Sequence, residues 1–224
     1  MSDYSLPPRS TLLAGMTGSG KTSFAFRYLL NAPVAARFIF DDRGQAANRL
    51  QKKHVGTANE CEAALLSRWI VFNPSRMFRG CLPGTEAGEN ALRWFCNWCY
   101  DASRRGRGRK ILLIDELWKW CNTRKLPIEL ATVAVEGRVE NLELVTATQT
   151  PEKIPFSIRG SATEVVLFKL QHAKAFEALD ELQLPGFDPA EIQALPLGSY
   201  VAFNRISGAV YRGKIFEQIC VRHF

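Results

Sequence analysis

Near the start of this 224-residue chain stands Gly15-Met16-Thr17-Gly18-Ser19-Gly20-Lys21-Thr22, and these eight residues decide the expected fold. They match the Walker A pattern G-x-x-x-x-G-K-[S/T], with an apolar stretch before them at residues 10–14 and a helical pattern after them. Glycines let the backbone curl so that successive N–H groups point inward, and the helix N-terminus adds partial positive charge. The stretch therefore predicts a loop that holds the phosphates of ATP.

The residues of this loop have separate expected roles. Lys21 is expected to reach the β- and γ-phosphates, and Thr22 to offer its hydroxyl to Mg²⁺. ATP and Mg²⁺ are therefore the expected cofactors. A chance glycine turn before a helix is the alternative, and the Lys-Thr pair disfavours it. The other phosphate-binding residues are expected to be Gly15, Met16, Thr17, Gly18, Ser19, Gly20 and Ser23.

Around the loop, short apolar runs alternate with amphipathic segments, which is typical of an α/β sheet with helices on both faces. The last part of the chain alternates around Ser207-Gly208 and predicts a β-hairpin. We expect a single domain over residues 1–224, with its core in residues 10–215. Strands are expected at residues 10–14, 36–40, 69–72, 110–114, 142–148 and 164–170, and helices at 21–30, 86–103, 127–139 and 172–182.

The overall charge is basic, because 29 Lys and Arg outnumber 22 Asp and Glu and give a net charge of +7. Such a balance favours polyanionic partners, nucleic acid first, but says nothing about the fold. The N-terminal residues do not form a signal peptide, and no apolar run approaches the roughly 18 residues that a membrane span needs. We therefore expect a soluble protein.

Six cysteines are scattered through the chain. Cys96 and Cys99 form a C-x-x-C pair, but they lie in a segment with apolar and aromatic residues at helical spacing. A zinc or redox site would need a second ligand pair or an exposed turn. Buried, reduced thiols are the expected state.

Two carboxylates end the apolar segment at residues 110–114, namely Asp115 and Glu116. In parallel α/β sheets the ligand lies across the carboxyl ends of the strands, so this pair is expected beside the phosphate loop. Asp115 is expected to hold Mg²⁺ through its water shell, and Glu116 to take a proton from the water that attacks the γ-phosphate. A helix N-cap followed by a first-turn acid is the alternative explanation.

Gln149 closes the next predicted strand, and its amide is expected to border the γ-phosphate and to report which nucleotide is bound. A turn residue before Pro151 is the structural alternative. Hydrolysis also needs positive charge as the transition state develops, often from the arginine of a neighbouring subunit. Arg138 and Arg159 are the candidates, and either can instead be a surface or helix-terminal charge.

The order of these motifs resembles the FtsK–HerA superfamily of DNA-pumping ATPases, over about residues 10–215. The Gln149 strand end with the following I-P-x-S-[I/V]-R segment points to this superfamily more specifically than the phosphate loop does. The motifs, in chain order, are GMTGSGKT (15–22), FDDRG (40–44), LLIDE (112–116), EGR (136–138), ATQTP (147–151) and IPFSIR (154–159).

In its small size, the chain is most similar to the genome-packaging ATPases of tailless, membrane-containing viruses such as tectiviruses. The resemblance implies a RecA-like (ASCE) sheet, a ring of six subunits, and DNA threaded through it. It also implies that Arg138 acts across the subunit interface, and that the protein works in the host cytoplasm or at a virion vertex with viral vertex or membrane proteins. One departure is Thr150, where many cellular members have arginine.

The densest basic run is expected to contact DNA phosphates without sequence preference. A solvated loop remote from DNA is an equal alternative for this run. Arg43 is a weaker candidate for DNA contact, and Trp118 and Trp120 are better explained by burial than by base stacking. The run consists of Arg104, Arg105, Arg107, Arg109 and Lys110, with glycines at 106 and 108.

The sequence thus predicts a DNA translocase that packages a viral genome, with double-stranded DNA as its partner. A filamentous-phage assembly ATPase that extrudes DNA is a related alternative, although such proteins usually carry a membrane segment. A small-molecule kinase also fits the phosphate loop, but it leaves Glu116 and Gln149 without a role. A non-catalytic, nucleotide-dependent DNA-binding or scaffold protein is the last alternative.

Overall fold

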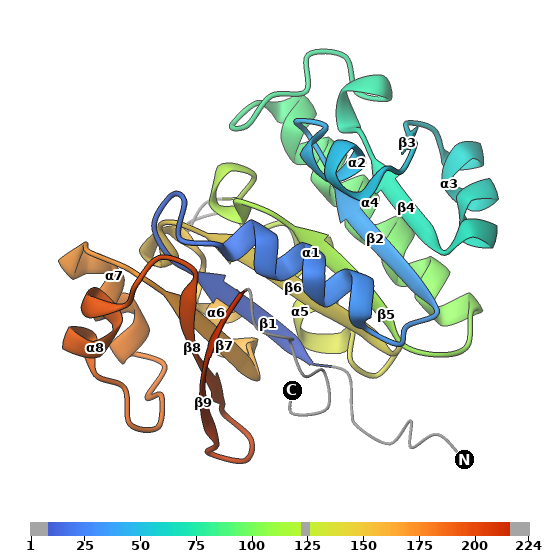
Figure 1. Cartoon of the computed structure of the whole chain (residues 1–224). Coiled ribbons are helices and arrows are strands. Elements are labelled where there is room, and N and C mark those ends of the chain that lie inside the picture. The colour runs from blue at the N-terminus through green and yellow to red at the C-terminus, as the bar shows by residue number, and fades with distance from the viewer. Residues whose placement is uncertain (1–8, 122–125, 216–224) are drawn as a thin grey trace, which may run out of the picture.

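A computed structural model describes residues 9–121 and 126–215 of the chain, and its strands form one nine-stranded sheet. The sheet order is β3-β4-β2-β5-β6-β1-β7-β8-β9 (Figure 1), parallel except for β8 and β9. The strands are β1 (Ser10–Ala14), β2 (Ala36–Phe40), β3 (His54–Val55), β4 (Trp69–Phe72), β5 (Lys110–Ile114), β6 (Leu142–Thr148), β7 (Glu164–Phe168), β8 (Ser199–Asn204) and β9 (Val210–Lys214).

The strand order places the predicted nucleotide-binding residues together at the carboxyl ends of the parallel strands. β6 lies between β1 and β5 and is parallel to both. Ala14 of β1 is opposite Thr148, and Ile114 of β5 is opposite Thr146. The three strands therefore end together, and the residues that follow them meet at their carboxyl ends. This confirms the α/β class and the C-terminal hairpin.

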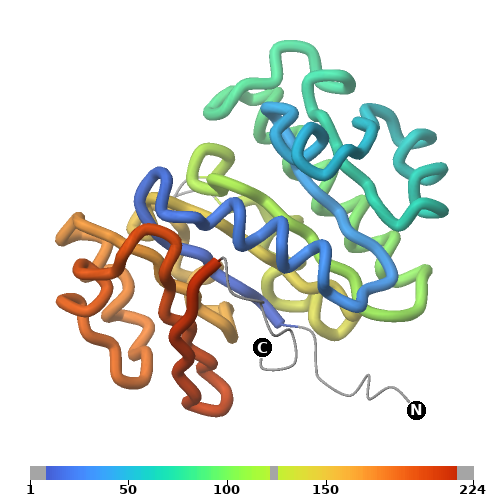
Figure 2. The backbone as a smooth tube through the Cα atoms, in the orientation of Figure 1, coloured from blue at the N-terminus to red at the C-terminus, as the bar shows by residue number. Residues whose placement is uncertain are grey.

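Helices cover both faces of the sheet, as Figures 1 and 2 show. α1 packs on one face against Leu13, Leu113 and Val145, while α4 and α5 pack on the other against Phe38 and Leu112. α7 and α8 extend that second face beside β7 and β8. The helices are α1 (Lys21–Asn31), α2 (Gln45–Leu50), α3 (Ala58–Ala64), α4 (Glu86–Arg105), α5 (Ile128–Glu136), α6 (Phe156–Ser161), α7 (Ala173–Asp180) and α8 (Pro189–Ala194).

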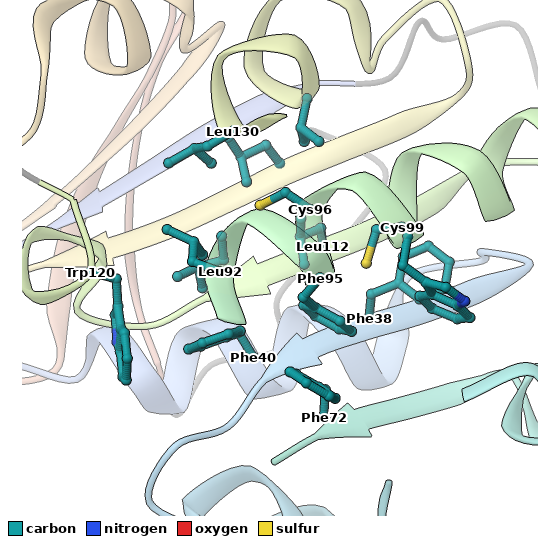
Figure 3. Close-up of a cluster of buried hydrophobic side chains, with 14 of the residues drawn as sticks. Phe38, Phe40, Phe72, Leu92, Phe95, Cys96, Cys99, Leu112, Trp120 and Leu130 are labelled. Carbon is teal, nitrogen blue, oxygen red and sulfur yellow. The ribbon is translucent and has the colours of Figure 1, made fainter. Parts of the chain in front are cut away.

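The long helix α4 is the main support of the sheet on its face. Thr85 caps it by accepting a hydrogen bond from the Gly88 amide, and acids in the first turn and arginines in the last complement the helix dipole. Phe95 of α4 stacks on Phe72 of β4 (Figure 3). Their ring centroids are 4.7 Å apart and their planes 12° apart. Both side chains are fully buried, so α4 and β4 share one core.

The expected strands up to residue 148 have the observed bounds, and the strand expected at 164–170 ends at Phe168. The helix expected at residues 127–139 ends earlier, at Glu136, because the chain turns there. The Leu142 amide donates to the Gly137 carbonyl at 2.8 Å, and Asn141 has the left-handed φ of 57°. Four short α-helices and one short strand were not expected from the sequence, namely α2, α3, α6, α8 and β3.

Five of the cysteines are buried and free, which confirms the expectation for them, and Cys220 lies outside the described residues. Burial raises the pKa of the Cys96 and Cys99 thiols, so both stay protonated. The described residues contain no group of three or more metal-ligating side chains arranged for a metal ion. None of their helices is long and apolar enough to cross a membrane.

Candidate nucleotide-binding site

The predicted phosphate loop joins β1 to α1 in a conformation that requires glycine. Gly18 and Gly20 have φ of 74° and 111°, in the region that only glycine adopts readily. Gly20 lies directly before α1, whose first amides have no acceptor within the helix. These free amides and the positive end of the helix dipole form a site suited to phosphate.

Residues that flank the C-terminal hairpin pack against this loop, a contact that the sequence did not indicate. A Cβ atom on Gly20 would lie 1.9 Å from Cδ1 of Ile215, which follows β9. The Gly198 amide, just before β8, donates to the Ser19 carbonyl at 3.1 Å. The C-terminal hairpin therefore supports the loop from one side, and any side chain at position 20 would displace it.

Lys21 begins α1 and is 5% exposed. Its Nζ donates to the carbonyls of Gly15 at 2.7 Å and Met16 at 3.0 Å, within the loop itself. Burial lowers the pKa of Lys21, and the nearby carboxylates Glu116 and Asp115 oppose this shift. The ammonium group thus lies inside the loop where the phosphates are expected.

Thr22 and Asp115 meet between α1 and the end of β5. The Thr22 hydroxyl donates to Oδ2 of Asp115 at 3.0 Å. Burial raises the pKa of Asp115, and the bond from Thr22 counteracts the rise. A hydroxyl and a carboxylate at hydrogen-bonding distance are oxygen donors of the kind that Mg²⁺ prefers, so the pair fits the expected ion.

Glu116 is held by several hydrogen bonds. Its backbone has the left-handed φ of 50°, and its Oε1 accepts from Nε2 of Gln149 at 2.6 Å. Its Oε2 accepts from Nε1 of Trp118 at 2.7 Å. The Gln149 side chain also accepts from the Thr17 hydroxyl at 2.6 Å, which links the phosphate loop to Glu116.

Thr17, Glu116 and Gln149 line a pocket of about 210 Å³. Its far wall is the acidic turn after β2, with Asp42 and Arg43, together with Lys119 and Trp120 after β5. Burial raises the pKa of Asp42, with Arg43 and Lys119 opposing it. Sequence analysis noted the acidic turn but assigned Lys119 no role in the site. The pocket also brings together Thr17, Gly18, Lys21, Thr22, Asp115, Glu116 and Gln149.

The two candidate arginines lie apart from this pocket. Arg138 is exposed in the turn between α5 and β6, at the opposite end of β6 from Gln149. Seven residues at about 3.3 Å each separate those ends by roughly 20 Å. Arg159 is 7% exposed and donates to the carbonyl of Ile154, with Glu181 2.9 Å away. Its position favours the structural alternative over a role in hydrolysis.

The basic run also lies at the amino-terminal edge of the sheet, and two of its members have partners inside the protein that disfavour them as DNA contacts. Lys110 is 3% exposed, and its Nζ donates to the Ser103 and Gly106 carbonyls. Arg109 is paired with Glu143, which is fully buried at the start of β6. Burial satisfies these charges inside the protein, so they are not available to phosphate groups.

The other three members of the run are exposed. Arg104 and Arg105 lie near Glu140 and Glu62 at 3.9 and 2.7 Å. Exposed pairs of this kind are weak and exchange partners readily. DNA contact by Arg104, Arg105 and Arg107 stays a prediction.

Comparison with solved structures finds the same fold in viral packaging enzymes. The genome-packaging NTPase B204 from Sulfolobus turreted icosahedral virus 2, in complex with AMP, matches with a TM-score of 0.69 and 15% identity, covering 93% of this chain and 98% of that one. B204 from Sulfolobus turreted icosahedral virus, described as a DNA-packaging ATPase, matches with a TM-score of 0.66, 14% identity and the same coverage.

A second kind of ATPase shares the fold more distantly. The cytoplasmic domain of the type VII secretion ATPase EccC from Thermomonospora curvata matches with a TM-score of 0.55 and 16% identity, covering 96% of this chain and 24% of that one. No protein-family model and no curated protein sequence matches this chain. The chain therefore has the P-loop NTPase fold seen in the B204 structures and in EccC.

Proposed function

We propose that this chain is an ATPase that drives DNA translocation and packages a viral genome into a preformed capsid. The convergence of Lys21, Thr22, Asp115, Glu116 and Gln149 on one pocket carries the proposal. A kinase loop accounts for the first two of these residues. The Glu116 carboxylate and the Gln149 side-chain amide lie 2.6 Å apart at adjacent strand ends. Hydrolysis gives both groups a role, whereas a kinase reaction leaves them without one.

Each group has a distinct role in the reaction. Lys21 and the loop amides hold the phosphates and offset the charge that develops on them. Glu116 orients the attacking water and takes its proton. Gln149 donates to the γ-phosphate or to the water, and its bonds to Thr17 and Glu116 connect nucleotide binding with the base. Thr22 and Asp115 would hold Mg²⁺, which when bound neutralises charge on the phosphates.

The position of Arg138 supports action in a neighbouring subunit. It is too far along β6 to reach the pocket of its own chain, and α5 and the turn that carries Arg138 have exposed apolar side chains. Ile128, Val135 and Val139 are 67%, 57% and 81% exposed, on α5 and in the turn after it. We propose that this surface packs against the next subunit of a six-membered ring and brings Arg138 to that subunit's γ-phosphate.

DNA is the proposed substrate of the motor, in double-stranded form. The net charge of +7 favours a polyanion, and binding through phosphates alone suits a motor that must hold any sequence. Arg104, Arg105 and Arg107 are the proposed contacts. The enzyme would work in the host cytoplasm or at a virion vertex.

The test is ATP hydrolysis with and without DNA, in the wild type and in Glu116→Gln. We expect DNA to stimulate phosphate release by the wild type, and Glu116→Gln to lower kcat by about 10²–10⁴ while ATP still binds. Double-stranded and single-stranded DNA are compared at equal nucleotide concentration. Hydrolysis that ignores DNA and survives Glu116→Gln contradicts the proposal, and phosphate transfer to a small acceptor identifies a kinase.

Mixed assemblies test the shared site. Arg138→Ala subunits retain a complete pocket, and Glu116→Gln subunits retain the arginine. We expect the rate of a mixture to depart from the average of the two separate variants, because some pockets regain both groups. A rate equal to that average shows that Arg138 does not act on a neighbour.

A further inference from the structure

The carboxylate of Glu116 is engaged on both oxygens. Oε1 accepts from Gln149 Nε2 at 2.6 Å. Oε2 accepts from Trp118 Nε1 at 2.7 Å and from the backbone N–H of Gln149 at 3.3 Å. A general base needs a free lone pair directed at its water. Oε2 already accepts two hydrogen bonds, so in this arrangement it has no acceptor position left for a water.

Gln149 also contacts Thr17 in the phosphate loop, so we expect a bound nucleotide to compete for its side chain. Trp118 has no such connection to the loop. It lies in the short 3₁₀ turn Leu117–Lys119, and its ring is flanked by Lys153 Nζ at 4.4 Å and Lys119 Nζ at 5.7 Å from the centroid. The two lysines hold the indole by cation–π attraction.

Trp118 lines a different pocket from Glu116. That second pocket, of about 500 Å³, lies between the start of α4 and the segment after β5, and Glu86, Arg93 and Pro127 line it with the indole. The indole ring thus lines the second pocket, while its N–H donates to Glu116 in the first pocket. A group that moves the ring in the second pocket would also release Glu116.

We propose that Trp118 is a positioning residue that restrains Glu116 in a resting state through its indole N–H. The inference rests on the proposed ATPase function and adds a control on it. Displacement of Trp118 by DNA that engages Lys119 and Lys153 frees Oε2 to accept the proton of the attacking water. Hydrolysis without a partner is then kept slow by the contact between Trp118 and Glu116.

Two substitutions separate the N–H from the ring. Trp118→Phe keeps an aromatic ring between the lysines but removes the donor. Trp118→His keeps a nitrogen at the ring position of the indole N–H but loses the larger ring. We expect Trp118→Phe to raise DNA-free kcat about tenfold with KM unchanged, which corresponds to about 1.4 kcal/mol, and Trp118→His to stay near the wild type at pH 8.

Trp94→Phe is the matched control. Trp94 is on α4, its ring centroid lies 5.2 Å from that of Phe72, and it lines neither of the two pockets. Thermal unfolding of every variant shows whether it is folded. A folded Trp118→Phe whose kcat is unchanged or lower overturns the inference. Wild-type protein that hydrolyses no ATP instead contradicts the proposed function, so the two failures differ.

Indole N–H resonances in ¹⁵N–¹H spectra test the contact without any reaction. The Trp118 signal is the one lost in Trp118→Phe. We expect it to shift in Glu116→Gln, where the acceptor loses its charge, while the Trp94 signal stays in place. If the Trp118 indole N–H signal has the same chemical shift in Glu116→Gln as in the wild type, the inference is overturned, whatever the rate of hydrolysis.

Discussion

Gln149 Nε2 lies 2.6 Å from Oε1 of Glu116, across the ends of two adjacent strands. The same amide group accepts from the Thr17 hydroxyl at 2.6 Å, so one side chain contacts both the phosphate loop and the expected base. We expect a γ-phosphate in the loop to compete for Thr17 and Gln149 together. Nucleotide binding would then change the surroundings of Glu116 before any chemistry.

Gln149→Ala should lower kcat by about 10²-fold, because a donor directed at the developing charge is lost. ATP affinity should change much less, since Lys21 and the loop amides are intact. Steady-state hydrolysis and equilibrium nucleotide binding measure the two effects. Thr17→Ser is the control, because it keeps the hydroxyl that Gln149 accepts from, and we expect near wild-type kcat. A loss confined to KM would contradict the role of Gln149 in the reaction.

Arg109→Met should lower the free energy of unfolding by about 3 kcal/mol, since it leaves the carboxylate of Glu143 buried without its cation. Urea unfolding measures this loss. Arg107→Ala, at an exposed position of the same run, should leave stability within about 0.5 kcal/mol but weaken DNA binding and reduce its salt dependence. If Arg109→Met keeps full stability, the buried pair does not have the role assigned here.

Glu164 should make stability depend on pH. Burial raises its pKa from 4.5 to about 7, despite Arg9 nearby and the hydrogen bond from Asn204. Between those values the unfolded chain loses the proton and the folded chain keeps it, so the free energy of unfolding falls as pH rises and levels off above about 7. Glu164→Gln removes this loss and should gain about 2–3 kcal/mol on the wild type between pH 4.5 and 8.

Urea unfolding at a series of pH values measures that difference. Glu177→Gln, on the exposed side of α7, is the control and should follow the wild type at every pH. Parallel curves for wild type and Glu164→Gln would show that Glu164 ionises normally in the folded protein.

Arg159→Ala should lower stability by about 2–3 kcal/mol, because the buried carbonyl of Ile154 loses its donor. Arg138→Ala should leave the unfolding temperature nearly unchanged and should reduce hydrolysis only where subunits assemble. Differential scanning calorimetry and hydrolysis at several protein concentrations distinguish the two arginines. A stable Arg159→Ala with low kcat would reverse their assignments.

Sequence alone predicted the phosphate loop, the carboxylates after β5 and the bounds of most strands, because each has a local signal. Buried parallel strands are short apolar runs, and the glycine pattern is specific. α3 also had a signal, since Thr57 and Glu60 form a capping box in which the Glu60 amide donates to the Thr57 hydroxyl at 3.2 Å. Sequence analysis missed it because the helix is only seven residues long.

The misplaced residues depend on partners far away in the sequence. The charge of Arg109 is visible in the chain, but its partner Glu143 comes from the next strand and is fixed only by the pairing of β5 with β6. The bond between Trp118 and Glu116 depends on the left-handed turn at Glu116. No local pattern indicates a positive φ at a glutamate, so this part of the site required the structure.

The packing of Ile215 against Gly20 also affects how the protein is made. A nascent chain emerges N-terminus first, so the motif at residues 15–22 leaves the ribosome long before the strand that supports it. The loop can take its supported shape only after residue 215 has been synthesised. Synthesis that stops within β8 or β9 would release a chain that has the whole motif but lacks the contact of Ile215 with Gly20.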